Sequence, residues 1–108
     1  MPALTAYFVM KVGRVQLIPY QRPGSAASVA AVEQAISSYG QRGTPLRAVM
    51  LARLGPNVWH ASPAAAMAVL EELEETARLW LLSTRAARAS TLGEADVDAL
   101  REAFQARW

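Results

Sequence analysis

The chain has 108 residues, of which 53% are hydrophobic and 19% are charged, so it predicts one folded domain over residues 1–108 and excludes intrinsic disorder. The net charge of +2 is too small to predict nucleic-acid binding, and the absence of cysteine excludes disulfides and thiolate metal sites. No apolar stretch approaches the roughly 20 residues of a membrane span and no secretory signal opens the chain, so we expect a cytoplasmic protein.

The first half of the chain predicts two short strands, a helix and a central strand. Residues 7–12 and 15–18 are rich in Val, Ile, Phe and Tyr around Gly13, which is typical of two strands joined by a tight turn. Ser25 or Ser28 then caps a helix. Its apolar positions are expected to form one buried stripe of Val29, Val32, Ile36 and Tyr39. The continuous apolar run at 47–52 predicts a buried central strand.

The second half predicts a turn, a short strand and two helices. Residues 55–57 read Gly-Pro-Asn, a turn signal, and residues 58–60 can form a further strand. Ser62-Pro63 starts a long helix that ends near Arg88, on which Glu74 can pair with Arg78. The stretch 85–90 is the best candidate for a flexible joint.

A last amphipathic helix completes the chain. Thr91 and Glu94 have the spacing of a capping box, and the apolar stripe of the helix is Val97, Leu100, Phe104 and Trp108. The order ββ-α-β(β)-α-α predicts an α/β domain in which helices pack on a sheet.

Three segments carry a resemblance to a known family. Residues 7–24 read YFVMKVGRVQLIPYQRPG, residues 47–59 read RAVMLARLGPNVW, and residues 71–82 read EELEETARLWLL. In sequence and order they are similar to the C-terminal half of class II aldolase/adducin-family proteins and, within that family, to bacterial 3-oxo-tetronate 4-phosphate decarboxylases. The resemblance implies a partial three-layer α/β/α fold and a protein that is usually a tetramer.

The resemblance also implies chemistry that needs a metal ion. In the intact family a zinc ion held by three histidines stabilises the enediolate that forms when a carbon-carbon bond breaks or carboxylate is lost. Two of these histidines, a carboxylate and the phosphate-binding loops lie in the first half of the family's chain, and nothing here corresponds to that half. The third histidine precedes a glycine, and the matching residue here is Leu54, which has no lone pair for a metal. We therefore expect no cofactor in this chain.

Three residues are weak candidates for a substrate site. Tyr7 and Tyr20 can be compared with a family tyrosine that reaches the substrate from a neighbouring subunit, although neither aligns securely with it and a buried strand tyrosine is the simpler interpretation. His60 is the sole imidazole and stands six residues after Leu54, but one histidine makes no zinc site.

Other motifs have structural interpretations that we favour over functional ones. The four glutamates Glu71, Glu72, Glu74 and Glu75 are interpreted as a solvated helix face rather than as an acid/base pair or a carboxylate metal site. Gly24-Ser25 is interpreted as a helix cap rather than as a phosphate loop. The arginines near the end could form a basic patch beside two tryptophans, for which core or interface packing is the better explanation; they are Arg85, Arg88, Arg101 and Arg107, with Trp80 and Trp108.

The sequence thus predicts a fragment or degenerate homologue of a zinc-dependent sugar-phosphate aldolase or decarboxylase that is inactive alone. A second hypothesis is a non-catalytic oligomerisation or partner-binding module. The expected partners are other copies of the chain, or a missing N-terminal half that could be encoded upstream, because losing that half exposes sheet edge and core face.

Overall fold

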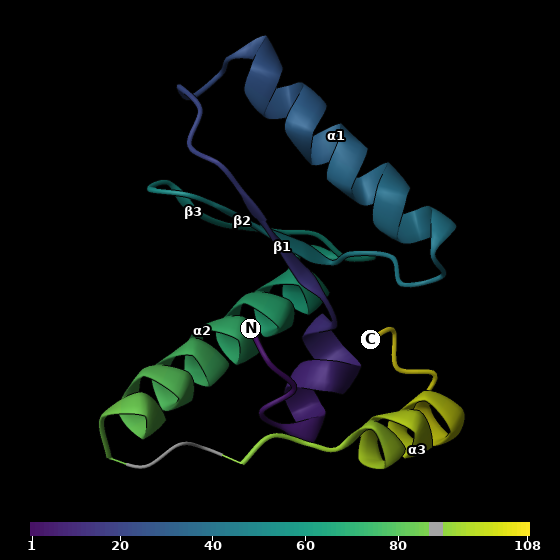
Figure 1. The fold of residues 1–108 in the computed structure, drawn as a ribbon. Helices are drawn as coiled ribbons and strands as arrows, with labels where there is room; N and C mark the ends of the chain where they lie inside the picture. Colours follow the sequence, from purple (N-terminus) through teal and green to yellow (C-terminus); the bar gives the residue numbers. More distant parts are fainter. Residues whose placement is uncertain (87–89) are drawn as a thin grey trace.

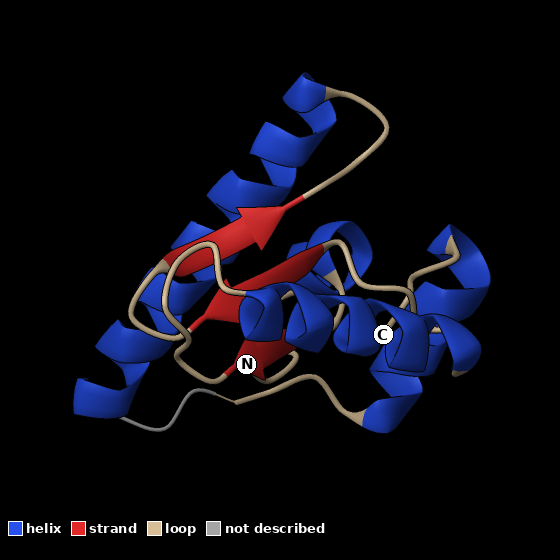
Figure 2. Cartoon of the chain, turned by 90° about the horizontal axis from the view of Figure 1, so that it is seen from above, coloured by secondary structure: helices blue, strands red, loops and turns tan. Residues whose placement is uncertain are grey.

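The computed structural model describes residues 1–86 and 90–108, in which a three-stranded sheet lies between layers of helices. Helix α1 covers one face of the sheet, whereas α2, α3 and the short helix η1 lie on the other side (Figure 1). Figure 2 shows the same layers from above. The elements are η1 (Phe8–Val12), β1 (Val15–Ile18), α1 (Ala26–Gln41), β2 (Ala48–Leu51), β3 (Gly55–Val58), α2 (Pro63–Ala86) and α3 (Glu94–Phe104). The predicted layered α/β class is confirmed.

The strand order is β1-β2-β3, so β2 is central, as its apolar sequence predicts. β1 pairs with β2 in parallel, with Val15 opposite Ala48 and Ile18 opposite Leu51, and α1 forms the crossover between them. β2 pairs with β3 antiparallel through a tight turn, and Leu51 lies opposite Gly55.

The alternation of side chains along β2 divides the hydrophobic core into two clusters. Val49 packs toward α1 with Ile18, Ala35 and Leu46. Its neighbour Ala48 belongs to the larger cluster on the other face. Other members of that larger cluster are Phe8, Val9, Val12, Val69, Leu73, Val97 and Trp108.

The prediction of a strand at residues 7–12 is wrong, because residues Phe8–Val12 form a π-helical turn. Phe8, Val9 and Val12 are all buried, a spacing that a helix can bury on one side but that a strand would divide between two faces. The Phe8 amide donates to the Thr5 hydroxyl (3.0 Å) and the Gly13 amide to the Phe8 carbonyl (2.9 Å). β-forming composition is therefore overridden by packing against α2 and α3.

The turn after β2 lies earlier than predicted. Residues 52–54 form it, and Gly55–Val58 are already strand β3. Arg53 takes a positive φ of 65°, which reverses the chain before the Gly-Pro-Asn sequence. Pro56 is tolerated in β3 because an edge strand does not need every amide.

The predicted helix stripes are only partly buried. On α1, Val29 and Ile36 are 54% and 41% exposed, while Ala35 is buried. On α2, Leu73 is buried, whereas Leu81 is 65% exposed. Phe104 of α3 is 64% exposed. Helix α3 ends at this residue, so the predicted helical stripe does not continue to Trp108.

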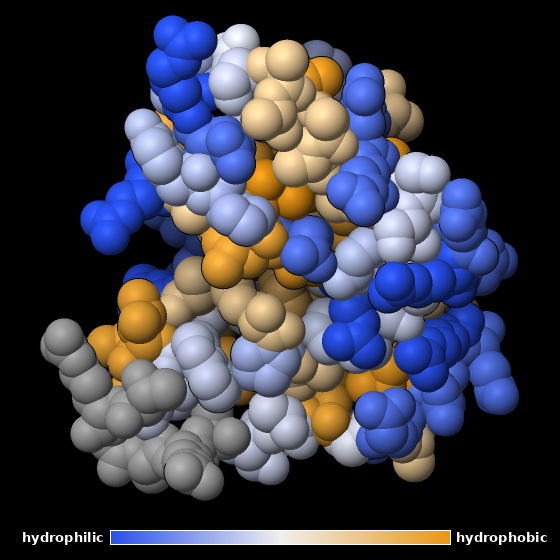
Figure 3. All heavy atoms as spheres, turned by 45° about the horizontal axis from the view of Figure 1, so that its top comes forward, coloured by the Kyte–Doolittle hydropathy of each residue, from blue (hydrophilic) through white to orange (hydrophobic). Residues whose placement is uncertain are grey.

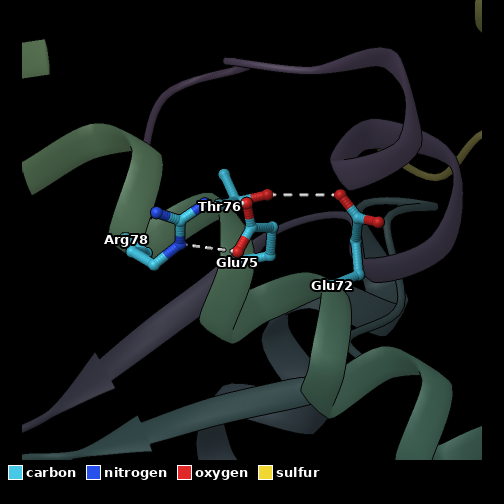
Figure 4. A network of polar contacts seen from close by, with 4 residues as sticks. All are labelled: Glu72, Glu75, Thr76 and Arg78. Carbon is cyan, nitrogen blue, oxygen red and sulfur yellow. Dashed lines mark hydrogen bonds and ion pairs between the residues drawn. The ribbon is translucent and has the colours of Figure 1, made fainter. Parts of the chain in front are cut away.

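Local polar contacts on α2 and α3 also differ from those predicted. Ser62 caps α2 as expected, with its hydroxyl accepting the Ala65 amide at 3.2 Å. Arg78 pairs with Glu75, at 2.6 Å, rather than with Glu74 (Figure 4). At the start of α3 the Gly93 amide donates to the Asp96 carboxylate at 3.1 Å, so the cap lies two positions later than the predicted Thr91–Glu94 box. The joint predicted at 85–90 lies mostly outside the described residues, and no described helix is long and apolar enough to cross a membrane.

Candidate functional site

Leu54 is the last residue of the turn at the carboxyl end of β2. The Leu54 amide donates to the Leu51 carbonyl (3.0 Å), and the Ala52 amide donates to the Ile18 carbonyl of β1 (3.0 Å). The Leu54 side chain is 45% exposed. The turn therefore places position 54 beside the carboxyl ends of two parallel strands, where ligands usually bind in open α/β sheets.

The residues around this turn do not fit a zinc site. Leu54 offers a hydrocarbon side chain, which cannot donate a lone pair to a metal. In residues 1–86 and 90–108 no group of three or more His, Cys, Asp or Glu side chains comes together to hold a metal ion. A zinc site needs at least three such donors.

The structure separates the sequence-predicted candidates into two groups at opposite ends of the sheet. Tyr20 follows β1, so it lies at the same end of the sheet as Leu54. Tyr7 and Tyr20 are 60% and 56% exposed and neither lies in a strand, so the interpretation of them as buried strand tyrosines is wrong. His60 follows β3, which runs back to the opposite end. There His60 and Lys11 line a hollow of about 230 Å³, and the Lys11 ammonium lies 5.1 Å from the centre of the Tyr7 ring. His60 thus lies at the other end of the sheet from position 54.

Comparison with known proteins identifies the family. Residues 1–81 match the family described as Class II Aldolase and Adducin N-terminal domain. This chain belongs to the class II aldolase/adducin family.

Curated relatives of this class II aldolase-like chain share one name. It is 47% identical to a 3-oxo-tetronate 4-phosphate decarboxylase of Cupriavidus necator, an alignment that covers 100% of this chain and 48% of the relative. It is 40% identical to the enzyme of that name from Pectobacterium atrosepticum, over 81% of this chain and 37% of the relative. The chain thus spans about half the length of the first of these relatives and less of the second, as expected from the resemblance to a C-terminal half.

Solved structures show the same fold. YgbL of Escherichia coli, described as a putative aldolase, epimerase or decarboxylase, aligns with a TM-score of 0.75 and 33% identity, over 94% of this chain and 45% of that protein. YgbL of Klebsiella pneumoniae aligns with a TM-score of 0.69 and 39% identity, over 93% of this chain and 44% of that protein. The framework described above is therefore the class II aldolase-like framework.

Two glutamates of α2 in this class II aldolase-like chain, Glu72 and Glu75, have structural partners. The Glu72 carboxylate accepts hydrogen bonds from the hydroxyls of Thr5 and Thr76, both at 3.3 Å (Figure 4 shows the Thr76 contact). The hydrogen bond from Arg78 holds the pKa of the Glu75 carboxyl below its usual range. A general acid needs the opposite shift, so Glu75 does not suit that role, which agrees with the interpretation of it as part of a solvated helix face.

Ser25 and Trp108 also have structural roles. The Ser25 hydroxyl accepts the Ser28 amide at 3.2 Å and caps α1, which agrees with the cap interpretation of Gly24-Ser25. Trp108 is 5% exposed, with its ring 5.8 Å from that of Phe8, so it is not available for base stacking. The side chains of Arg85 and Arg88 lie outside the described residues.

Arg47 is a structural residue that sequence reasoning did not single out. Its guanidinium donates to the carbonyls of Met10 (2.9 Å) and Lys11 (2.8 Å), near the end of η1. Burial, and to a lesser degree the charge of Arg107, lower the Arg47 pKa. The signal that could have found it is a single basic residue at the start of an otherwise apolar strand.

Proposed function

We propose that this chain is a degenerate half of a 3-oxo-tetronate 4-phosphate decarboxylase-like lyase and has no catalytic activity alone. The observation that carries the proposal is Leu54, a residue without a metal donor at the carboxyl ends of β1 and β2. The shared name of the curated relatives and the 47% identity to one of them support the substrate class from which the chain descends.

The chemistry explains why position 54 matters. Loss of carboxylate from a 3-oxo acid leaves negative charge on the substrate oxygens, and a divalent cation can stabilise this charge as a Lewis acid. The family resemblance assigns the cation to three histidines, and His60 is the sole histidine of this sequence. A leucine at position 54 also presents apolar bulk to any cation held there by other donors.

The test measures metal content and turnover together. Purified chain is loaded with zinc, dialysed and assayed for bound metal and for decarboxylation of 3-oxo-tetronate 4-phosphates, with the Cupriavidus necator relative as the positive control. We expect neither stoichiometric zinc nor turnover for the chain. Stoichiometric zinc together with turnover would refute the proposal.

A Leu54→His variant makes the test sharper. Because position 54 is partly exposed, the change should leave the fold intact, with an effect within about 0.5 kcal/mol on unfolding. We expect the variant still to lack stoichiometric zinc, since a single restored imidazole supplies one of the three donors required. Tight binding by this variant would show that other donors of the chain complete a site.

The second candidate function is a non-catalytic oligomerisation or partner-binding module. The observation that favours it is the number of large apolar side chains that remain exposed, among them Leu17, Val29 and Leu82. Apolar side chains are visible between polar ones on the molecular surface (Figure 3). Light scattering tests this function, and a stable monomer that binds no apolar dye would argue against it.

A further inference from the structure

The outer edge of β1 is an open strand edge. In the described residues β1 pairs with β2 on one side only. The Ile18 carbonyl faces β2, where it accepts the Ala52 amide at 3.0 Å. Because backbone groups alternate along a strand, those of Val15 and Leu17 face outward. The Gln16 side-chain amide donates to the outward Leu17 carbonyl at 3.0 Å, which is a local contact rather than a strand pairing.

An apolar hollow lies beside this edge, on the face of the sheet that α2 covers. It has a volume of about 210 Å³ and is lined by Met1, Val15, Leu17, Met50 and Leu73. Leu17 is 59% exposed, which is unusual for the one leucine of a short apolar strand. The hollow is next to the main core, since Leu73 and Val15 both belong to that cluster or pack against it.

Helix α2 leaves the hollow open. It starts beneath the sheet and runs away from it along its length (Figure 1). On the distal half of α2, Leu79 and Leu82 are 36% and 53% exposed. The sheet and α2 thus move apart along the length of α2, and both carry exposed apolar side chains there. The free edge of β1 lies at one side of this region.

The opposite edge of the sheet is less suited to strand addition. In β3, Pro56 lacks an amide hydrogen, and proline on an edge strand opposes pairing with a further strand. β1 has the sequence Val-Gln-Leu-Ile, with neither proline nor charge. The features that normally protect a strand edge are therefore present on β3 and missing on β1.

The comparisons supply a candidate for the polypeptide that covers this surface. The structure of this chain aligns with 45% of the Escherichia coli YgbL chain, and its sequence aligns with 48% of the Cupriavidus necator relative. In these relatives more than half of a chain accompanies the same framework. We propose that the free edge of β1 and its hollow are the docking surface for a polypeptide equivalent to that remaining part. The polypeptide adds a strand along β1 and places an apolar side chain beside Leu17.

This inference rests on the part of the proposed function that makes the chain one half of the family fold, but not on the loss of the metal site. Docking requires no metal and is measured as binding, so its failure can be told apart from a failure of the zinc and turnover test. The probe is the part of the Cupriavidus necator relative that this chain does not match, tagged and co-expressed with the chain. We expect the two to purify together. Leu17→Lys should weaken the complex at least about tenfold, because docking would bury an ammonium in an apolar hollow.

Phe104→Lys is the matched control. It also replaces an exposed apolar side chain with a lysine, at 64% exposure compared with 59% for Leu17, but on α3 rather than at the β1 edge. We expect it to bind like the unmodified chain. Thermal unfolding of each variant shows whether it keeps the fold.

Hydrogen exchange on the unmodified chain gives a readout that needs no variant. Docking should slow exchange of the outward Leu17 amide, while the amides of β2 change little. Three results would overturn the proposal: a probe that stays insoluble or unbound beside the unmodified chain, equal weakening by both lysine variants, and unchanged Leu17 exchange. Self-association through β1 that the probe cannot displace would assign the edge to a second copy instead.

Discussion

Replacing Phe8 with alanine should be among the most destabilising single changes in this protein. Phe8 is fully buried, and its ring meets that of Trp108 edge to face, with centroids 5.8 Å apart. Truncating a buried phenylalanine costs about 3 to 5 kcal/mol, and the lost aromatic pair accounts for about 0.5 to 1.5 kcal/mol of such a loss. We expect the free energy of unfolding to fall by about 4 kcal/mol, a large part of the stability of a domain this small.

Urea unfolding followed by tryptophan fluorescence and by circular dichroism measures this change. Phe104→Ala is the control, since its side chain is 64% exposed and its loss should cost less than about 0.5 kcal/mol. A Phe8→Ala effect as small as that of the control would mean that η1 is not packed beneath the sheet. The division of the core between two faces would then be refuted as well.

Four further substitutions test other parts of the structure. Gly13→Ala should cost at least about 2 kcal/mol, because Gly13 has a φ of 75° and an added Cβ would lie 2.6 Å from a backbone carbonyl oxygen of the C-terminal tail. Gly43→Ala, with a φ of 74° and nothing within 4 Å, should cost only about 1 kcal/mol in the same urea titration. Ser25→Ala removes the cap of α1 and should lower the unfolding free energy by about 1 kcal/mol, measured by thermal melting. The pKa of Glu75 is lowered in the folded state by Arg78, so its stabilising effect is present above the unfolded pKa and is lost as pH falls through the folded pKa. Glu75→Gln should therefore reduce the loss of stability between neutral and acidic pH, and an unchanged pH profile would contradict this pairing.

Part of the candidate site could be predicted from the sequence. The order of the three similar blocks places Leu54 directly after a buried strand, and the structure has it in the turn at the end of β2. The sequence could not show that Tyr20 shares this end of the sheet whereas His60 does not. That division depends on β1 running parallel and β3 antiparallel to β2, and pairing directions depend on the crossover and the turn.

The sequence by itself determined the features whose causes lie within a few residues of each other. The cap at Ser25, the start of α2 after Ser62 and the central strand β2 follow from local hydrogen bonding, proline geometry and an apolar run of strand length. The family likewise follows from residues read in order.

Only the tertiary structure decided which apolar side chains are buried. Phe8–Val12 has the composition of a strand but is a π-helical turn, because α2 and α3 pack against it there. Val29 and Leu17 are apolar yet exposed, because no described side chains pack closely over them. Burial is a property of distant neighbours in space, so the local pattern of a segment predicts a candidate face but cannot supply the surface that covers it.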